Sequence, residues 1–443
     1  MSLAPHPAEF QLWPGFDRAF HDDIAVLGQM PEGIALRDRL DRAYALSEDR
    51  GVPIGQPTLV GDELALSLTR FVAAYHRAIE AIVEASLTDG RVMEVLSTPG
   101  EIARDVDEAR NPKNGRVHLC RLDILPSPDG GFWVLETNAN CPGGLVFVGG
   151  AVAMWREFLD ARGVHLPPPM ANEDPTWMAR WFLDVAEAET GVRPQRIGLL
   201  RKEGGNRLEM DEFRECFASV GVEAVEADPR ELSRSSAGQL ELGGGPIGHA
   251  YLKLGIQPFC DMRSELDVFV ESLHDRSLFV QNGLRGRWIG DNKLCLAILY
   301  DEAFRYLFNP DDWALIHDHI PWSANLALCP NPEVAEIRRH PEDFVLKRPL
   351  DTRGRGVVIG PEIEDPEAWN AAVDVALEQG WLVQEFVTGT EIEPDPGSVD
   401  QNRHDLALGA INGKISAVFM RSSSEMRVNV ARSGRLHPVF MRG

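Results

Sequence analysis

The sequence has few of the features that mark a disulfide-stabilised, membrane-spanning or disordered protein. Its six cysteines among 443 residues are sparse, and none of them shows a C-x-x-C or Cys/His spacing of the kind that binds zinc. We therefore expect reduced thiols. The most apolar stretch, Gly143 to Trp155, has 13 residues, whereas a spanning helix needs about 20. No long biased tract and no internal repeat is present, so a globular protein is indicated.

Basic residues are also scarce. Lys and Arg number 44 against 68 Asp and Glu, which gives a net charge of -24. This balance argues against a surface that follows the phosphates of DNA or RNA. It fits simple solubility, and it also fits a basic or amine-bearing partner. The first residues lack a basic segment followed by an apolar one, so no signal peptide is predicted and the cytoplasm is the expected location.

The chain is rich enough in apolar residues, at 44%, to build a sizeable core, and its length suits about three domains. Residues 62–87 carry apolar positions at helical spacing, and the first hundred residues are predicted to be mainly helical. A proline-rich boundary at 166–175 precedes a β-α-β pattern over 196–228, which predicts a parallel sheet. The C-terminal third alternates helices and strands in an α+β pattern.

Two short strands, 117–125 and 132–137, flank the turn sequence PSPDGG and predict a β-hairpin. A two-residue Asp-Gly loop would place Asp123 opposite Glu136, and Arg121 opposite Asn138. These four side chains would then share one face of the hairpin, because side chains alternate along a strand.

Facing carboxylates destabilise a hairpin unless a cation or a proton lies between them. Oxygen ligands beside an asparagine suit Mg²⁺, which keeps several waters and is completed by substrate phosphates. A metal site is therefore one interpretation of this face. The other is the solvated polar face of an edge hairpin. The ANCPGG sequence that follows Asn138 allows close approach of a ligand to the backbone, or simply a tight turn.

A second motif, FVLKRPLDTRGRGVVIG, spans 344–360. An apolar strand delivers Lys347, and a basic glycine loop follows it. Such a loop suits a mobile flap over a polyphosphate, because glycines expose backbone N–H groups and the cations neutralise charge. A plain hairpin with a solvated basic tip is the alternative. The loop is not of the Walker A type, and its residues are Thr352, Arg353, Gly354, Arg355 and Gly356.

Two further positions are candidates for nucleotide contacts. The strand WLVQEFV ends on Gln384 and Glu385, which could present backbone groups to an adenine edge or could simply leave the sheet. Lys293 stands beside Asn292 near the expected start of a helix over 291–309, where a surface lysine is the plainer interpretation.

The order of these motifs resembles the ATP-grasp ligases, and within them the circularly permuted branch that contains eukaryotic glutathione synthetase and bacterial glutathionylspermidine synthetase. In that branch an R-x-D strand and an E-x-N motif precede the ATP-binding lysines. Here Arg121-Leu-Asp123 and Glu136-Thr-Asn138 precede Lys293 and Lys347. The resemblance runs from about residue 115 to the C-terminus.

The resemblance implies roles for individual residues. It makes Asp123, Glu136, Asn138 and Asp351 ligands of Mg²⁺. It places the catalytic arginines Arg121 and Arg421 near the reacting phosphoryl and carboxylate groups, and it assigns substrate contacts to Asn429 and Arg432. The implied ATP contacts are Lys293, Lys347, Thr352, Arg353, Gly354, Gly356, Gln384, Glu385, Phe386 and Val387.

The fold implied by the resemblance is an α/β and α+β ATP-grasp fold with a pre-ATP-grasp (Rossmann-like) domain and a helical N-terminal region. The expected division is a helical region over 1–112, the metal-binding hairpin and following segment over 113–165, a substrate α/β domain over 176–285, and the ATP-binding lobes over 286–443. The TRGRG loop departs from the glycine triplet of the named enzymes, and no amidase domain is present. Neither glutathione nor spermidine is therefore assumed as a substrate.

The implied activity is ATP-dependent ligation of a carboxylate to an amine through an acyl phosphate, with ATP and Mg²⁺ as cofactors. The expected partners are a small-molecule or peptide carboxylate and an amine, with neither nucleic acid nor membrane, and the assembly is left open between a monomer and a homodimer. Two alternatives come from other classes. One is a catalytically silent ATP-grasp-like binding protein, and the other is a phosphotransferase that stops at a stable phosphorylated product.

Overall fold

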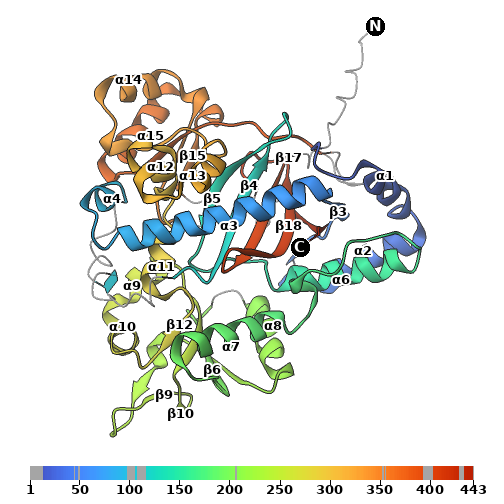
Figure 1. Cartoon of the computed structure of the whole chain (residues 1–443), viewed down its shortest axis with the longest axis vertical. Coiled ribbons are helices and arrows are strands. Elements are labelled where there is room, and N and C mark those ends of the chain that lie inside the picture. Colours follow the sequence, from blue (N-terminus) through green and yellow to red (C-terminus); the bar gives the residue numbers. More distant parts are fainter. Residues whose placement is uncertain are drawn as a thin grey trace.

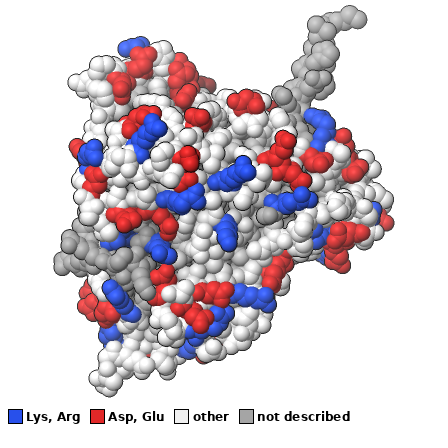
Figure 2. Space-filling view, in the orientation of Figure 1, with Lys and Arg blue, Asp and Glu red and all other residues white. Residues whose placement is uncertain are grey.

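A computed structural model gives the structure of the chain. It describes residues 13–43, 45–47, 50–96, 105–106, 116–204, 207–351, 354, 356–392, 403–428 and 434–442. No helix among them is long and apolar enough to cross a membrane. All six cysteines are free thiols, as expected. On the face shown in Figure 2, basic and acidic side chains are interspersed, without an extended basic patch.

The N-terminal region is mainly helical, as predicted. Its helices are α1 (Arg18–Leu27), α2 (Pro31–Ala43), α3 (Asp62–Ala85) and α4 (Gly90–Val95), with short strands β1 (Ala45–Ser47), β2 (Arg50–Gly51) and β3 (Thr58–Leu59). The long helix α3 begins with two acidic residues, which favour its N-terminus, and buries one apolar face along its length.

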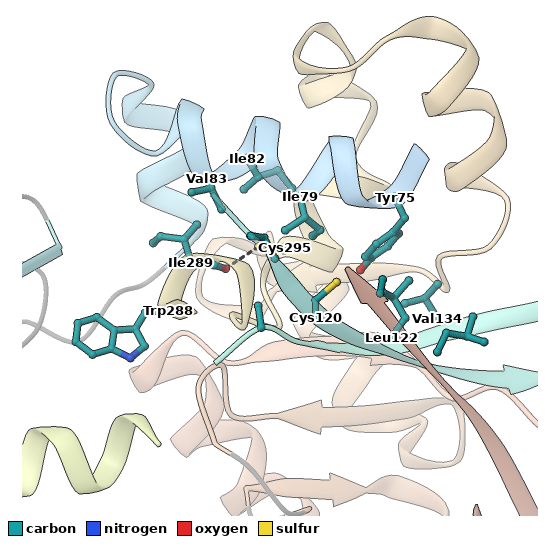
Figure 3. Close-up of a cluster of buried hydrophobic side chains, with 14 of the residues drawn as sticks. Tyr75, Ile79, Ile82, Val83, Cys120, Leu122, Val134, Trp288, Ile289 and Cys295 are labelled. Carbon is teal, nitrogen blue, oxygen red and sulfur yellow. Dashed lines mark hydrogen bonds between the residues drawn. The ribbon is translucent and has the colours of Figure 1, made fainter. Parts of the chain in front are cut away.

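A six-stranded sheet forms the centre of the molecule, in the order β3-β19-β18-β17-β4-β5. It unites the predicted hairpin with strands from both ends of the chain. Helix α3 crosses one of its faces (Figure 1). There Tyr75 and Ile79 lie over Cys120 and Leu122 in an apolar core (Figure 3). The strands are β4 (Leu119–Pro126), β5 (Phe132–Asn138), β17 (Arg403–Ile411), β18 (Lys414–Ser423) and β19 (Arg435–Phe440).

The hairpin has the predicted pairing at the polar face but reaches it differently. Arg121 pairs with Asn138 and Asp123 with Glu136. The loop, however, holds three residues rather than two, since the Ser127 N–H donates to the Gly131 carbonyl. A one-residue bulge between the Asp123 and Ile124 pairs restores the register. The expectation of a two-residue loop was wrong, and the two offsets cancel.

A four-stranded parallel sheet confirms the β-α-β prediction, with the order β12-β11-β6-β7. A small antiparallel sheet of β8 (Ser233–Arg234), β9 (Leu240–Leu242) and β10 (Gly245–Pro246) extends from it. The elements are α6 (Phe147–Asp160), α7 (Trp177–Thr190), β6 (Arg196–Arg201), α8 (Arg207–Ser219), β7 (Glu223–Ala227), β11 (His249–Lys253), α9 (Ile256–Met262), α10 (Asp267–His274) and β12 (Phe279–Val280).

A second four-stranded sheet, in the order β13-β16-β14-β15, is antiparallel and has its own core around Trp369. The helix expected over 291–309 is shorter. Asp291 and Lys293 precede it, and a 3-10 turn (Glu302–Leu307) follows. The elements are α11 (Gly283–Gly290), α12 (Cys295–Tyr300), α13 (Pro310–His317), β13 (Ser323–Asn325), α14 (Asn331–Arg339), β14 (Phe344–Lys347), β15 (Val357–Ile359), α15 (Pro366–Gln379) and β16 (Leu382–Glu385).

Candidate functional site

The polar face of the hairpin carries a buried ion pair. Arg121 donates to Asp123 through both edges of its fork, with Nε–Oδ1 at 2.7 Å and Nη2–Oδ2 at 2.8 Å. Its third nitrogen donates to the Gly143 carbonyl at 2.8 Å. The Asn138 amide also donates to Asp123 Oδ2, at 3.2 Å. The hairpin therefore brings the R-x-D and E-x-N motifs together, and it also fixes the loop that follows them.

Two residues from the C-terminal strands complete this ion-pair network. Arg421 on β18 lies with Nη2 2.9 Å from Asp123 Oδ2. It also donates to Asp405 on β17, at 2.8 Å from Nε and 2.6 Å from Nη2. Because β17 pairs with both β4 and β18, the sheet register places these side chains on one face. The guanidinium of Arg421 is thus shared between two carboxylates.

The two buried carboxylates have opposite pKa shifts. Burial opposes the charge of Asp123, but Arg121 and Arg421 outweigh it and hold the pKa of Asp123 below its usual value. Burial dominates at Asp405, where Arg421 only partly compensates and Asp123 adds repulsion, so the pKa of Asp405 is raised. At neutral pH the shared arginine therefore faces a firmly ionised Asp123 and a more readily protonated Asp405.

The two predicted lysines both contact strand β5 of the hairpin. Lys293 Nζ is 3.2 Å from Glu136 Oε2 and donates to the Asp351 carbonyl at 2.7 Å. It is buried, so the interpretation as a surface lysine was wrong. Lys347 donates to the Gln384 side chain at 2.6 Å and to the Leu135 carbonyl at 3.0 Å. Leu135 is the bulged residue of the hairpin, so the bulge turns a backbone acceptor toward Lys347.

The charge of Lys347 is poorly compensated. Burial lowers the pKa of Lys347 to about 8, the charge of Lys293 adds to this, and Glu136 opposes it. A nearby phosphate would favour the ammonium form and raise this pKa again. An anionic ligand beside Lys347 would supply the opposite charge that burial leaves largely uncompensated in the free protein.

We expect nucleotide binding to take up a proton near pH 8. If Lys347 has a pKa of about 8 in the free protein and a higher one beside a triphosphate, affinity should be constant below pH 8 and fall as pH rises above it. Calorimetry in buffers of different ionisation enthalpy measures this uptake directly. The Lys347→Met variant should show none of it, and an unchanged proton uptake in that variant would assign the linkage to another group.

The glycine loop is described in part. Gly354 and Gly356 have positive φ angles of 68° and 63°, which suit glycine. Arg427 donates to the carbonyls of Gly354, at 3.2 Å, and Val357, at 3.3 Å. Asp351 lies at the loop's start, 3.9 Å from the Arg348 guanidinium. Of the predicted site residues, Thr352, Arg353, Asn429 and Arg432 lie outside the described residues.

The predicted adenine hinge lies at the end of β16. The backbone N–H groups of Glu385 and Phe386 already donate to the carbonyls of Trp322, at 2.8 Å, and Asp343, at 2.7 Å. Gln384 is buried and bridges Lys347 to Ser323. The hinge amides of Glu385 and Phe386 are therefore engaged inside the protein. The adenine hinge over Gln384–Val387 stays a prediction.

Comparison with solved structures identifies the fold of the chain. An apo-form glutathione synthetase-like effector from Globodera pallida superposes with a TM-score of 0.61 over 94% of this chain and 99% of that chain, at 14% sequence identity. The chain has a glutathione synthetase-like fold. The ATP-grasp fold class predicted from the order of the motifs is thereby confirmed.

Sequence comparison is less specific. No protein-family model matches the chain. A protein of Frankia casuarinae with the provisional name glutamate–cysteine ligase 2-2 is 23% identical in an alignment of length 439 that covers 90% of this chain and 46% of that protein. The chain thus spans about half the length of this relative. D-alanyl-alanine synthetase A of Vibrio cholerae aligns over 53% of this chain and 69% of that chain at 12% identity, with a TM-score of 0.29 that carries no argument.

Within the glutathione synthetase-like fold, the donor set suits Mg²⁺. Asp123, Glu136 and Asn138 offer carboxylate and amide oxygens from two adjacent strands, the ligand type that hard divalent cations prefer. Glu136 is the more accessible of the two acids, with a side chain 30% exposed against 2% for Asp123. Both oxygens of Asp123 are held by arginines. A metal would therefore have to displace a guanidinium from that carboxylate.

Sequence reasoning missed Asp405 and Arg427. Asp405 is the single carboxylate of the apolar strand β17, and an isolated acid on a strand that is otherwise buried was the available signal. Arg427 had no such signal, because the segment after β18 contains several similar polar residues. Its contact with the glycine loop depends on tertiary structure alone.

Proposed function

We propose that the chain is an ATP-dependent carboxylate–amine ligase. The observation that carries the proposal is the convergence of three separate segments on the hairpin, where Lys293, Lys347 and Arg421 join the R-x-D and E-x-N motifs. Of the cations gathered there, Lys347 makes no ion pair among the described residues, and burial lowers its pKa to about 8, so an anionic ligand would stabilise its charged form. This charge pattern supports binding of a nucleotide triphosphate beside a substrate carboxylate.

In the proposed reaction, an oxygen of the substrate carboxylate attacks the γ-phosphorus of ATP, and the bond from that phosphorus to the β,γ-bridging oxygen breaks to release ADP. The amine nitrogen then attacks the carbon of the acyl phosphate, a C–N bond forms, and inorganic phosphate leaves with loss of a proton from nitrogen. Charge accumulates on phosphoryl oxygens in the first step. The protein's task is positioning and electrostatic stabilisation rather than covalent catalysis.

The chain's own residues divide this task. Lys293 and Lys347 would hold the phosphates, because both are buried and point toward Glu136 and the hairpin bulge. Arg121 and Arg421 would meet the transferred phosphoryl group once it replaces Asp123 as their partner. Asp123, Glu136 and Asn138 would hold Mg²⁺, and the bound ion would supply charge neutralisation at the phosphates.

We expect Mg²⁺ to bind well only together with nucleotide. Asp123 is occupied by two arginines in the free protein, and the remaining ligands are too few for a tight all-protein site. Calorimetry should show weak Mg²⁺ binding alone and clear binding with a non-hydrolysable ATP analogue. Tight binding of Mg²⁺ by the apo protein would contradict the assignment of these ligands.

An ADP-release screen tests the function. Purified protein is supplied with MgATP, a panel of carboxylates, and each carboxylate with and without a panel of amines. A ligase releases ADP fastest with a particular pair and forms an amide, which mass spectrometry detects. Amine-independent ADP with a stable product would indicate a phosphotransferase. Absence of ADP with every pair, together with measurable ATP binding, would indicate a silent binding protein.

A further inference from the structure

Helix α11 is bounded by two buried polar residues that both contact the chain directly after the E-x-N motif. Asn282 precedes the helix and Asp291 follows it, and they are 1% and 4% exposed. The Asn282 amide donates to the Ala139 carbonyl at 2.6 Å. Asp291 Oδ1 accepts from the N–H groups of Ala139, at 2.7 Å, and Asn140, at 2.9 Å. The two ends of α11 therefore hold the residue that follows the predicted metal ligand Asn138.

These contacts fix two successive peptide units. A peptide unit is planar, so a hydrogen bond to its N–H also sets the direction of its carbonyl. The bond from the Ala139 N–H to Asp291 thus orients the unit that begins at Asn138. The next unit is held at both edges, because its carbonyl accepts from Asn282 and its N–H, on Asn140, donates to Asp291. Since only two dihedral angles per residue are soft, the backbone after Asn138 keeps little freedom.

Asn282 has an uncommon backbone conformation at this position. Its φ is 63°, in the left-handed region that few residues other than glycine adopt. Its N–H donates to His118 Nδ1 at 3.1 Å. Its side chain accepts from the Leu119 N–H at 3.0 Å and donates to the Leu119 carbonyl at 2.7 Å. One side chain therefore connects the first residue of β4 to the residue after β5. Conformations of this kind persist where the surrounding contacts determine them, and they cluster at functional sites.

The helix is a rigid support for these two side chains. All eight residues of α11 are buried, and Ile289 shares an apolar core with Val83 of α3 (Figure 3). Gly290 ends the helix at a point where a Cβ atom would lie 3.2 Å from the Ala139 Cβ and from Val117 Cγ2. The lack of a side chain there lets the helix approach the end of β5 closely. A site held by such an element is more precise than one held by a loop.

We propose that Asn282 and Asp291, called here the α11 clasp, are positioning residues for the predicted magnesium ligand Asn138. Neither is a metal ligand in this assignment, and both act through the backbone of Ala139 and Asn140. The inference rests on the proposed function for the identity of the ion. Mg²⁺ requires nearly ideal octahedral geometry at roughly 2.0 to 2.1 Å, so a small displacement of one ligand lowers affinity. Groups that orient metal ligands typically contribute about 10- to 100-fold to metal affinity.

Calorimetry of Mg²⁺ binding in the presence of a non-hydrolysable ATP analogue tests the α11 clasp. Asp291→Ala removes the acceptor of two backbone N–H groups, so we expect Mg²⁺ affinity to fall about 10- to 100-fold. Asp291→Asn keeps an oxygen acceptor and loses the charge, and it should stay within about threefold of the unmodified protein. Unchanged affinity in Asp291→Ala would overturn the proposal. Equal weakening by both variants would also overturn it, because Asp291 would then act through its charge.

Asn282→Gly tests the other end of the α11 clasp. Glycine adopts a φ of 63° without strain, so the variant loses the side-chain bonds and keeps the backbone conformation. We expect Mg²⁺ affinity to fall by about 10- to 100-fold here too. Asn412→Gly is the matched control, since Asn412 also has a positive φ, 46°, in the exposed turn between β17 and β18. It should leave affinity unchanged, and an equal loss in both variants would contradict the assignment. If Asn282→Gly does not fold, the Asp291 variants decide the question.

Hydrogen exchange without metal or nucleotide gives a second readout. The N–H groups of Ala139 and Asn140 should exchange slowly in the unmodified protein and in Asp291→Asn, and faster in Asp291→Ala. Equally slow exchange in Asp291→Ala would show that another group holds this backbone and would overturn the proposal.

The calorimetry distinguishes failure of the α11 clasp from failure of the proposed function. If the unmodified protein binds no Mg²⁺ with nucleotide present, the magnesium assignment is refuted, and the role of the α11 clasp is refuted with it. If the unmodified protein binds Mg²⁺ with nucleotide and Asp291→Ala binds it equally well, only the α11 clasp is refuted.

Discussion

Replacing Arg121 with lysine should lower turnover roughly 10- to 1000-fold while ATP affinity changes only a few fold. The arginine fork makes two bonds to Asp123 and a third to the Gly143 carbonyl. Lysine keeps the charge but cannot reproduce this geometry. A fixed fork that meets phosphoryl oxygens during transfer stabilises the transition state more than the bound substrate, so its loss lowers rate rather than affinity.

The matched control is Arg156→Lys. Arg156 makes the same pattern outside the cluster, with Nε and Nη2 on the Glu173 carboxylate at 2.5 and 2.8 Å and Nη1 on the Pro167 carbonyl at 2.8 Å. Both variants lose a buried fork and should lose similar thermal stability, but only Arg121→Lys should lose turnover on the substrate pair found in the screen. Near-normal turnover of Arg121→Lys would mean that Arg121 only neutralises Asp123 and Glu136 within the hairpin.

Lys347→Ala should weaken nucleotide binding by about 1.5 to 3 kcal/mol, which is roughly 10- to 150-fold, because the variant lacks a charge-assisted contact to phosphate. The fold should remain intact. Burial already lowers the pKa of Lys347 to about 8, so the ammonium group is held in the free protein at a cost. Titration with a fluorescent ATP analogue measures the affinity, and thermal unfolding checks the fold.

The isosteric Lys347→Met variant separates charge from packing. It should match the alanine variant in nucleotide affinity and keep a thermal midpoint close to that of the unmodified protein, because methionine fills the space beside Gln384 and the Leu135 carbonyl. A collapse of the midpoint in both variants would make Lys347 a structural residue that holds β14 against the hairpin bulge.

Local pattern predicted much of the secondary structure. The apolar spacing over 62–87 yields α3, and the β-α-β segment forms a parallel sheet. These two predictions are correct because helix and strand periodicity are set by neighbouring residues. The prediction of a helix over 291–309 was wrong at its start, because α12 begins only at Cys295. Asp291 accepts instead from the backbone N–H groups of Ala139 and Asn140, at 2.7 and 2.9 Å, a long-range contact that no local pattern encodes.

The residue pairing at the polar face of the hairpin was predicted correctly although the loop length was not. The turn sequence was assigned one residue too few, and the bulge at Leu135 added one back. The backbone groups at the bulge bind residues from distant segments. The Val134 N–H donates to the His319 carbonyl, and the Leu135 carbonyl accepts a hydrogen bond from Lys347. Only the assembled sheets supply those partners.

The sequence by itself determined the residue types of the candidate site and the order of their motifs, and through this order the resemblance to the ATP-grasp ligases that implied the fold class. Tertiary structure decided which charges meet. Asp405 and Arg421 reach Asp123 only because β17 and β18 join the hairpin sheet some 280 residues later. Burial then sets their pKa values. Desolvation depends on everything packed around a group, so it could not be read from the group's neighbours in sequence.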